Sequence, residues 1–143
     1  MTLKSFKPYT KSMRTTILVD KNDLWKGKPE KKLISLRTRS SGRNNQGRIT
    51  SRHKSSGHKK KYRMIDFHRN KTNISAIIKR IEYDPFRSAN IMLMEYEDKT
   101  MSYILAPAGV SVGDKVSSGS QLDIKPGNSM IIGEIPSLSL IHI

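Results

Sequence analysis

Residues 74–105 read ISAIIKRIEYDPFRSANIMLMEYEDKTMSYIL and hold the clearest structural signal in the chain. Apolar residues recur with the short spacing typical of β-strands at 74–83, 89–96 and 100–105, and the breaks between these runs carry an Asp-Pro pair and a Glu-Asp-Lys turn. The middle run is apolar on both faces, which predicts a strand in the centre of a sheet. The stretch therefore predicts three consecutive strands joined by turns.

Shorter strand-like pieces flank this stretch on both sides. Residues 62–68 alternate between two faces before it, and residues 114–116 and 129–132 follow it after a loop that contains Gly and Pro. No segment shows the spacing of an amphipathic helix. Five or six short strands with turns between them predict an all-β fold. A small five-stranded oligonucleotide-binding barrel at 62–136 fits the length of this segment.

A strongly basic stretch, LRTRSSGRNNQGRITSRHKSSGHKKKYR, precedes the predicted barrel at 36–63. It carries ten Lys or Arg residues, and no Asp or Glu occurs between Glu30 and Asp66. Residues 1–72 hold 21 basic and 4 acidic residues (net charge +17), whereas residues 73–143 hold 6 basic and 8 acidic residues (net charge −2). The basic stretch offers too little apolar surface to fold alone, so we expect a polyanion to order it, and nucleic-acid phosphate is the obvious candidate.

The glycines of the basic stretch indicate how its cations are presented. Gly42, Gly47 and Gly57 stand among Asn and Ser residues that favour turns and tolerate left-handed backbone angles. The cations therefore come from a series of bends, which favours a segment at 36–61 that threads between RNA helices. A flexible, solvated charge run such as a localisation signal is the alternative interpretation.

Residues 1–35 contain few periodic apolar positions and predict an extended amino-terminal arm, not a domain. One short strand-like run, Ile17 to Val19, interrupts this arm. Trp25 is open to two interpretations, because a lone tryptophan stacks on a base in some proteins and packs against its own protein or a neighbour in others. The partner of the arm, RNA or another protein, is equally open.

The composition excludes several classes of protein. Zero cysteines exclude disulfide bonds and cysteine-based metal sites and are compatible with a reducing compartment. No apolar run is long enough to span a bilayer, and the amino terminus lacks the apolar core of a signal peptide. The sequence therefore predicts a soluble intracellular protein with no membrane partner. No Arg-rich amphipathic presequence is recognisable either.

Histidines near the basic stretch raise the question of catalysis. His53, His58, Asp66 and His68 can be drawn as a metal or acid–base group, but no Cys and no paired carboxylate accompany them at ligand spacing, and the surrounding cations would repel a metal ion. Histidines in such surroundings are expected to stack on bases or donate to phosphates. We therefore expect no catalytic residue, no metal and no cofactor, and a protein that is not an enzyme.

Seven motifs occur in an order that is specific to one protein family. They are GKPEKKL (27–33), SGRNNQGRIT (41–50), GHKKKYR (57–63), IDFHRN (65–70), IEYDPFRSANI (81–91), YILAP (103–107) and IKPGN (124–128). From residue 27 to residue 136 the chain resembles the amino-terminal half of the universal large-subunit ribosomal protein L-two.

This resemblance implies a structural constituent of the large ribosomal subunit that binds large-subunit rRNA, contacts neighbouring ribosomal proteins, and supports assembly, subunit association and the peptidyl-transferase region. It implies an oligonucleotide-binding barrel preceded by a long basic amino-terminal extension that penetrates rRNA. A free oligonucleotide-binding RNA regulator or chaperone is the second functional hypothesis.

The resemblance also implies which residues contact rRNA. Those matched to the family are Arg43, Asn44, Asn45, Arg48, Arg52, His53, His58, Lys59 and Arg63, with Arg69 and Arg87 nearby on the barrel. The other cations of the stretch complete the predicted RNA-binding set: Arg37, Arg39, Lys54, Lys60 and Lys61. Arg87 has a second interpretation, an ion pair with Asp84 across the turn.

The chain departs from the family pattern at two places. Ser55 and Ser56 stand where the family has consecutive glycines, so the local RNA path is expected to differ. Residues 137–143 form a truncated link where the family continues into a second barrel. We expect either a fragment or a protein encoded in two pieces, with a separate polypeptide that carries the second half. A split gene and the many Lys, Ile, Ser and Met residues favour a mitochondrial ribosome, with the bacterial cytoplasm or a plastid as alternatives.

Overall fold

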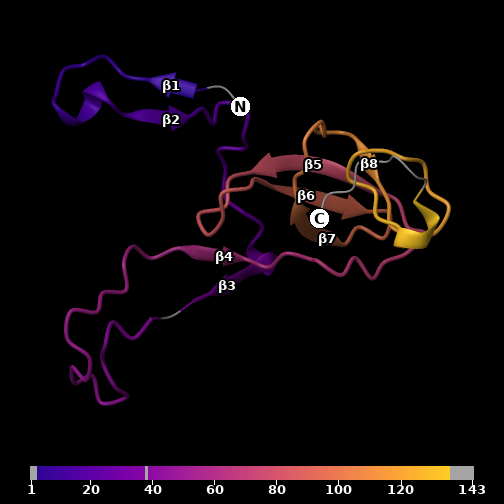
Figure 1. Ribbon diagram of the computed structural model, residues 1–143. Helices are drawn as coiled ribbons and strands as arrows, with labels where there is room; N and C mark the ends of the chain where they lie inside the picture. The colour runs from indigo at the N-terminus through magenta and orange to yellow at the C-terminus, as the bar shows by residue number, and fades with distance from the viewer. Residues whose placement is uncertain (1–2, 38, 136–143) are drawn as a thin grey trace.

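The computed structural model describes residues 3–37 and 39–135 and is built from short strands (Figure 1). The strands are β1 Leu3–Ser5, β2 Ile17–Val19, β3 Ile34–Leu36, β4 Lys61–Arg63, β5 Ala76–Glu82, β6 Ile91–Tyr96, β7 Met101–Leu105 and β8 Lys115–Val116. The helical elements of the described ranges are three 3-10 turns, η1 Ser12–Arg14, η2 Lys31–Leu33 and η3 Ile132–Glu134. The prediction of an all-β fold is confirmed. None of the helical turns in these ranges has the length or apolar character needed to cross a membrane.

The largest sheet is antiparallel and has the strand order β7-β6-β5-β8. Ile91 of β6 is paired with Glu82 of β5 on one side and with Leu105 of β7 on the other, so the predicted central strand is central. The register shifts between Ile78 and Arg80 of β5, and such a bulge bends a strand and increases its twist. The sheet curls into a half-barrel (Figure 1), which is consistent with the predicted oligonucleotide-binding type of fold.

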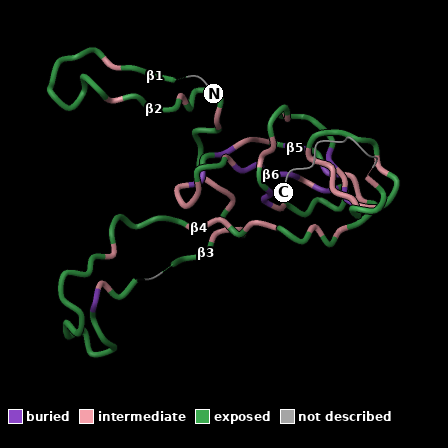
Figure 2. The backbone as a smooth tube through the Cα atoms, in the orientation of Figure 1, coloured by how far each residue is buried: buried purple, intermediate pink, exposed green. Residues whose placement is uncertain are grey.

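Alternate residues of β6 fill two apolar cores on opposite faces of the sheet. Met92 and Met94 belong to the larger core, together with side chains from β5, β7 and β8. Ile91 and Leu93 belong to the smaller one and pack with Tyr103 of β7. All five side chains are at most 2% exposed, and Figure 2 shows the buried positions concentrated on these strands. The core is therefore organised around β6.

The strand predicted at 62–68 is shorter in the structure. Its first part forms β4, and its remainder contributes one parallel bridge between Ile65 and Tyr103 at the β7 edge of the sheet. The backbone N–H of Asp66 also donates to the Tyr103 carbonyl oxygen at 2.8 Å. This bridge extends the curled sheet by one position beyond β7.

The prediction of a strand at 129–132 is wrong. Only Ser129 forms a bridge, with Ser118, and the chain then enters η3 at Ile132. Ile131 and Ile132 are 68% and 75% exposed, so neither side chain has the core contact that would hold a strand in place. The barrel end predicted at Pro136 and the link predicted at 137–143 lie outside the described residues.

The amino-terminal segment begins with a hairpin that lies away from the main sheet (Figure 1). Residues 3–5 of β1 pair with residues 17–19 of β2, so the predicted run Ile17 to Val19 is a strand, although its partner was not predicted. The apolar side chains of this hairpin are exposed, including 68% of Leu3 and 62% of Ile17. The hairpin therefore adds nothing to the barrel core.

The next part of the arm lies against the barrel. The backbone N–H of Trp25 donates to the carbonyl of Ile81 at 2.8 Å, and the guanidinium of Arg80 lies 5.0 Å from the centre of the Trp25 ring. The Nζ atom of Lys21 lies 3.4 Å from the centre of the Tyr83 ring. Trp25 thus contacts its own protein while 50% of the residue is exposed, and stacking of this ring on a base stays a prediction.

Candidate nucleic-acid interface

A two-stranded ladder brings both ends of the basic stretch together. Strands β3 and β4 pair in antiparallel register, from Ile34 with Arg63 to Leu36 with Lys61. Leu33, immediately before β3, packs against the smaller core and fixes the ladder to the barrel. Residues 37–60, here called the basic loop, run out from this ladder and project from the barrel (Figure 1). Its cations are thus carried on a loop that is anchored at both ends.

The tip of the basic loop is shaped by a side chain that was predicted to contact RNA. The Asn44 Oδ1 atom accepts the backbone N–H groups of Gln46 at 3.0 Å and Arg48 at 2.9 Å. The Asn44 N–H in turn donates to the Arg48 carbonyl, and Arg43 bridges to Ile49. Asn44 therefore closes a tight turn, and its amide NH₂ group is the part left for a partner.

Gly42 holds the base of this turn. Its carbonyl oxygen accepts the backbone N–H groups of Thr50 at 2.9 Å and Ser51 at 3.0 Å. Its φ angle is +74°, and a Cβ atom placed there would lie 2.4 Å from the Ser51 carbonyl oxygen. Both the backbone angle and the close approach require glycine. The loop thus has local structure of its own.

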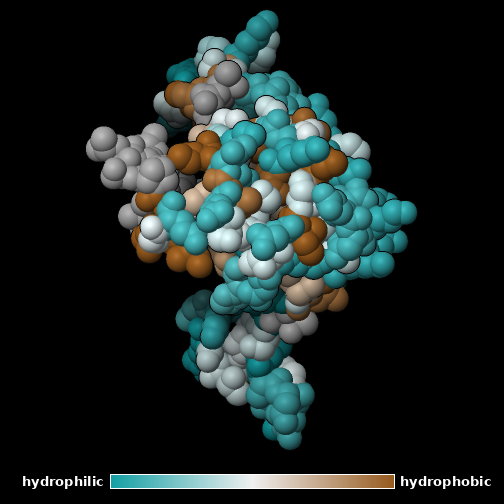
Figure 3. Space-filling view, turned by 90° about the vertical axis from the view of Figure 1, so that its right-hand side faces the viewer, coloured by the Kyte–Doolittle hydropathy of each residue, from teal (hydrophilic) through white to brown (hydrophobic). Residues whose placement is uncertain are grey.

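Within the part of the chain that the structure describes, the cations of the basic loop and of β4 have no carboxylate partners. The ion pairs of the described residues join Lys71 to Asp98, Lys79 to Glu95, Arg80 to Glu82, Arg87 to Asp84 and Lys125 to Asp123. None of the ten Lys or Arg residues between positions 37 and 63 occurs in these pairs. In Figure 3 hydrophilic side chains cover much of the lobe that projects downward from the barrel. The loop therefore presents positive charge that the described protein does not neutralise.

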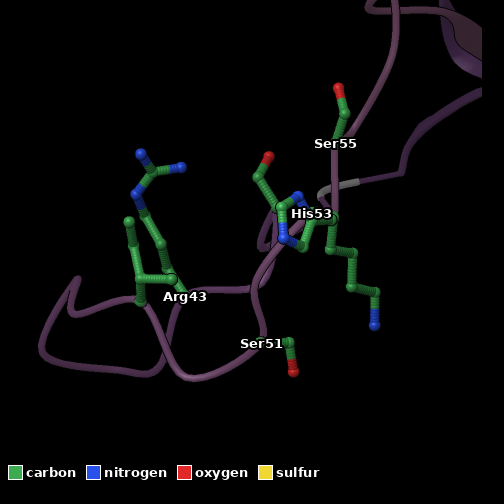
Figure 4. A pocket seen from close by; sticks show the side chains of 7 residues that line it. Arg43, Ser51, His53 and Ser55 are labelled. Atoms are coloured by element: carbon green, nitrogen blue, oxygen red, sulfur yellow. The ribbon is translucent and has the colours of Figure 1, made fainter.

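A hollow of about 440 Å³ lies at the tip of the loop (Figure 4). Its lining includes Arg43, Ser51, His53, Lys54 and Ser55. Figure 4 shows the Arg43 guanidinium and the His53 ring rising from the same part of the loop. A guanidinium fork, an ammonium, an imidazole and hydroxyl groups are donors that suit phosphate oxygens. The tip therefore brings three predicted residues, Arg43, His53 and Lys54, into one anion-compatible surface.

A second hollow of about 400 Å³ lies where the loop meets the barrel. It is lined by cations from both arms of the loop and by the aromatic ring of Phe86 from the turn after β5. The predicted residues that line it are Arg37, Arg39, His58, Lys59 and Lys60. Three predicted site residues, Arg43, His53 and Lys54, thus line the hollow at the tip, and these five line the hollow at the base. His53 and His58 line different hollows, and the described residues contain no cluster of three His, Asp or Glu side chains that could hold a metal ion.

Two predicted residues on the barrel are engaged within the protein. The guanidinium of Arg69 donates to the carbonyl oxygens of Gly127 and Ser117, and burial lowers the pKa of this side chain. Arg87 pairs with the fully buried carboxylate of Asp84 at 3.1 Å, so the ion-pair interpretation of Arg87 describes the structure. RNA binding by either arginine stays a prediction. Of the other predicted residues, Asn45, Arg52 and Lys61 are exposed and line neither hollow.

A buried polar cluster that sequence reasoning missed ties the arm to the barrel. The Tyr103 hydroxyl donates to the Glu82 carboxylate at 3.0 Å and accepts the backbone N–H of Glu30 at 2.9 Å. The Nε–H of Arg80 donates to the same carboxylate at 2.6 Å. Burial raises the pKa of Tyr103, which keeps its hydroxyl protonated as the donor to Glu82. The cluster fixes residue 30, just before the ladder that carries the basic loop.

Comparison with known proteins identifies one family and, among the relatives, proteins that share a single name. The family described as "Ribosomal Proteins L2, RNA binding N-terminal domain" matches residues 30–118. The chain is 52% identical over 142 residues to "Large ribosomal subunit protein uL2" of Granulibacter bethesdensis and 55% identical over 142 residues to the protein of that name in Rickettsia felis. Each match covers 99% of this chain but only 51% or 52% of the relative. The chain spans about half the length of the curated relatives that it matches.

Proposed function

Because the chain belongs to the ribosomal L2 family, we propose that it is a structural constituent of the large ribosomal subunit that binds large-subunit rRNA. In this role it supports assembly, subunit association and the peptidyl-transferase region, beside neighbouring ribosomal proteins. The observation that carries the proposal is the basic loop, whose cations have no carboxylate partner among the described residues. The proposal assigns no catalytic residue, metal or cofactor to the chain.

The proposed binding segment is the predicted threading extension at 36–61. Phosphate contacts supply most of the affinity of such a surface, because each neutralised phosphate releases condensed counterions. Arg43 at the tip and Lys59 at the base line separate hollows. The two hollows could therefore bind phosphates at two positions along one RNA strand. The pairing of β3 with β4 means that the segment would enter rRNA as a loop held at both ends. The barrel at 62–136 would add RNA contacts through Arg63, Arg69 and Arg87, of which the contact through Arg69 contributes little affinity because its guanidinium also donates within the protein.

Incorporation into subunits tests this function. Replacing Arg43, Arg48 and Arg52 with Ala should leave the barrel folded by circular dichroism and remove the protein from large subunits in a high-salt sucrose gradient. The matched control replaces three exposed barrel cations, Lys99, Lys115 and Lys125, with Ala and removes the same charge.

The control variant should sediment with large subunits at stoichiometric yield. Normal incorporation of the loop variant would overturn the assignment of the loop. Elution of the unaltered protein among free proteins would instead favour the second hypothesis, a free oligonucleotide-binding RNA regulator or chaperone.

We also propose that a separate polypeptide carries the second half of the family protein. The support is that the chain aligns with about half of each relative. Mass spectrometry of purified large subunits should find this second polypeptide. The same experiment gives the intact mass of the present chain, and a mass that corresponds to a full-length relative would contradict the proposal.

We propose a mitochondrial ribosome as the location, with the bacterial cytoplasm or a plastid as the alternatives. The support is compositional, a chain rich in Lys, Ile, Ser and Met. The relatives reported above are bacterial and support a ribosome without distinguishing the organelle. Fractionation with an antibody against the chain should place it in mitochondrial large subunits, and its recovery from another compartment would contradict this location.

A further inference from the structure

The hollow at the base of the basic loop differs from the hollow at the tip because it has an aromatic wall. Three separate segments meet there, represented by residues 36, 37 and 39, by residues 56–60 and by the turn after β5. Phe86 from that turn is half-buried and lines the hollow, and Leu36 adds a second apolar side chain. The hollow therefore combines an apolar face with the cations of the loop.

The position of Phe86 is fixed by its neighbours. The Asp84 Oδ1 atom accepts the backbone N–H of Phe86 at 2.9 Å, and the Asp84 carboxylate is fully buried and paired with Arg87. The Phe86 ring meets the ring of Tyr62 edge to face, with 5.3 Å between the ring centres and an angle of 79° between the planes. A ring held in this way costs little further entropy when a ligand stacks on it.

The cationic side of the hollow is partly fixed as well. The Arg39 guanidinium donates to the Ser56 carbonyl at 3.2 Å, which joins the two arms of the loop. The Lys60 Nζ atom donates to the Pro85 carbonyl at 3.4 Å, which joins the loop to the aromatic turn. Arg37, His58 and Lys59 are exposed and complete this side of the hollow. None of the described residues that line the hollow carries a carboxylate, so the hollow does not suit a metal ion or an amine.

We infer that this hollow binds one unpaired nucleotide, whose base stacks on Phe86 and whose phosphate is held by Arg37, Lys59 and the neighbouring cations. The bases of an RNA duplex are covered by their neighbours in the stack, so only a splayed nucleotide can present a free base face to a protein ring. A volume of about 400 Å³ lies within the range of small-ligand pockets. An acidic peptide would satisfy the cations but would leave the aromatic wall unused.

This inference rests on the proposed RNA-binding function and refines it. Phosphate contacts along the loop give affinity for any RNA, whereas the Phe86 hollow adds a preference for a single-stranded position. Binding in this hollow also requires that the RNA contain an unpaired nucleotide directly beside the barrel.

The test uses the full chain and a single-stranded RNA of about ten nucleotides that carries 2-aminopurine, a length within the site sizes of single-strand binders. The competing probes are an RNA duplex of equal length and a polyglutamate peptide of equal charge. Phe86→Leu removes the aromatic face but keeps an apolar side chain against Tyr62. Phe86→Tyr keeps the face, and Phe67→Leu is the matched control, because Phe67 is 65% exposed and does not line the hollow.

We expect stacking to quench 2-aminopurine fluorescence with the unaltered chain, Phe86→Tyr and Phe67→Leu, and not with Phe86→Leu. Phe86→Leu should also bind single-stranded RNA about tenfold more weakly and duplex RNA unchanged. Equal affinity of Phe86→Leu and the unaltered chain for single-stranded RNA would overturn the inference while leaving RNA binding intact. Tighter binding of polyglutamate than of single-stranded RNA would identify a peptide site instead. Failure of the unaltered chain to bind either RNA would overturn the proposed function itself.

Discussion

The barrel sheet and the basic loop use their charged side chains in opposite ways. In and around the sheet, five cations are paired with carboxylates, as in Arg80 with Glu82 and Lys79 with Glu95. Between positions 37 and 63, ten cations have no carboxylate partner among the described residues. The sheet therefore uses part of its charge for contacts within the protein, whereas the loop keeps its charge for a polyanion. The difference separates the part of the chain that supplies stability from the part that supplies binding.

The sharpest contrast in stability is expected at Tyr103. Its ring is fully buried and its hydroxyl contacts both Glu82 and the Glu30 amide, so Tyr103→Ala should lower the free energy of unfolding by about 3–5 kcal/mol. Tyr9→Ala is the control, because Tyr9 is 79% exposed, and it should change stability by less than about 0.5 kcal/mol. Urea unfolding followed by circular dichroism measures both. Similar losses in the two variants would contradict the described core.

Arg69 tests whether a predicted RNA contact serves the barrel instead. Arg69→Met leaves the carbonyls of Gly127 and Ser117 without this donor and should cost about 1–3 kcal/mol of stability, with little loss of RNA affinity at fixed salt. Arg52→Met in the exposed loop should show the reverse, with unchanged unfolding and weaker RNA binding. Thermal unfolding and RNA titration of the same samples separate the two effects. An Arg69 variant of normal stability with weakened RNA binding would reverse our assignment.

The smallest expected effect is the loss of a stabilising contribution from Asp98 at low pH. Hydrogen bonds from Lys71 and Thr100 lower the pKa of the exposed Asp98 carboxylate to about 2. Because the folded value lies below the unfolded value of 3.8, this group adds stability above the unfolded pKa, and the contribution is lost as the pH falls toward 2. Carboxylate NMR should show this titration, and Lys71→Met should raise the Asp98 pKa. An unchanged Asp98 pKa in that variant would contradict the role of Lys71.

Much of the sheet could be predicted because β5 buries alternate side chains and β6 is buried on both faces, which leaves a period-two pattern in the first and a continuous apolar run in the second. The β3–β4 ladder could not be predicted in the same way, since its three-residue strands are separated by a polar loop and pair over a long sequence distance. The strand expected at 129–132 failed because its isoleucines find no core. The spacing of apolar residues alone does not reveal whether the fold provides a surface on which those side chains can be buried.

The positive charge of the candidate site could be predicted from the sequence, but the arrangement of its side chains could not. A carboxylate-free run from 36 to 63 is visible in the sequence, and the structure leaves its cations unpaired within the described residues. The turn-closing role of Asn44 and the inward guanidinium of Arg69 depend on backbone angles and carbonyl positions that no residue pattern records. Phe86 was missed because only the fold brings its turn beside the loop.

The salt dependence of RNA binding tests the central claim most directly. Every phosphate that a variant no longer neutralises should reduce the slope of log affinity against log salt by about 0.7–0.9. The Arg43, Arg48 and Arg52 triple alanine variant should therefore show a slope that is smaller by roughly 2 to 3 units. The Lys99, Lys115 and Lys125 variant, with the same change in net charge, should keep the slope of the unaltered chain. Equal slopes for the two variants would show that net charge, and not the basic loop, binds the RNA.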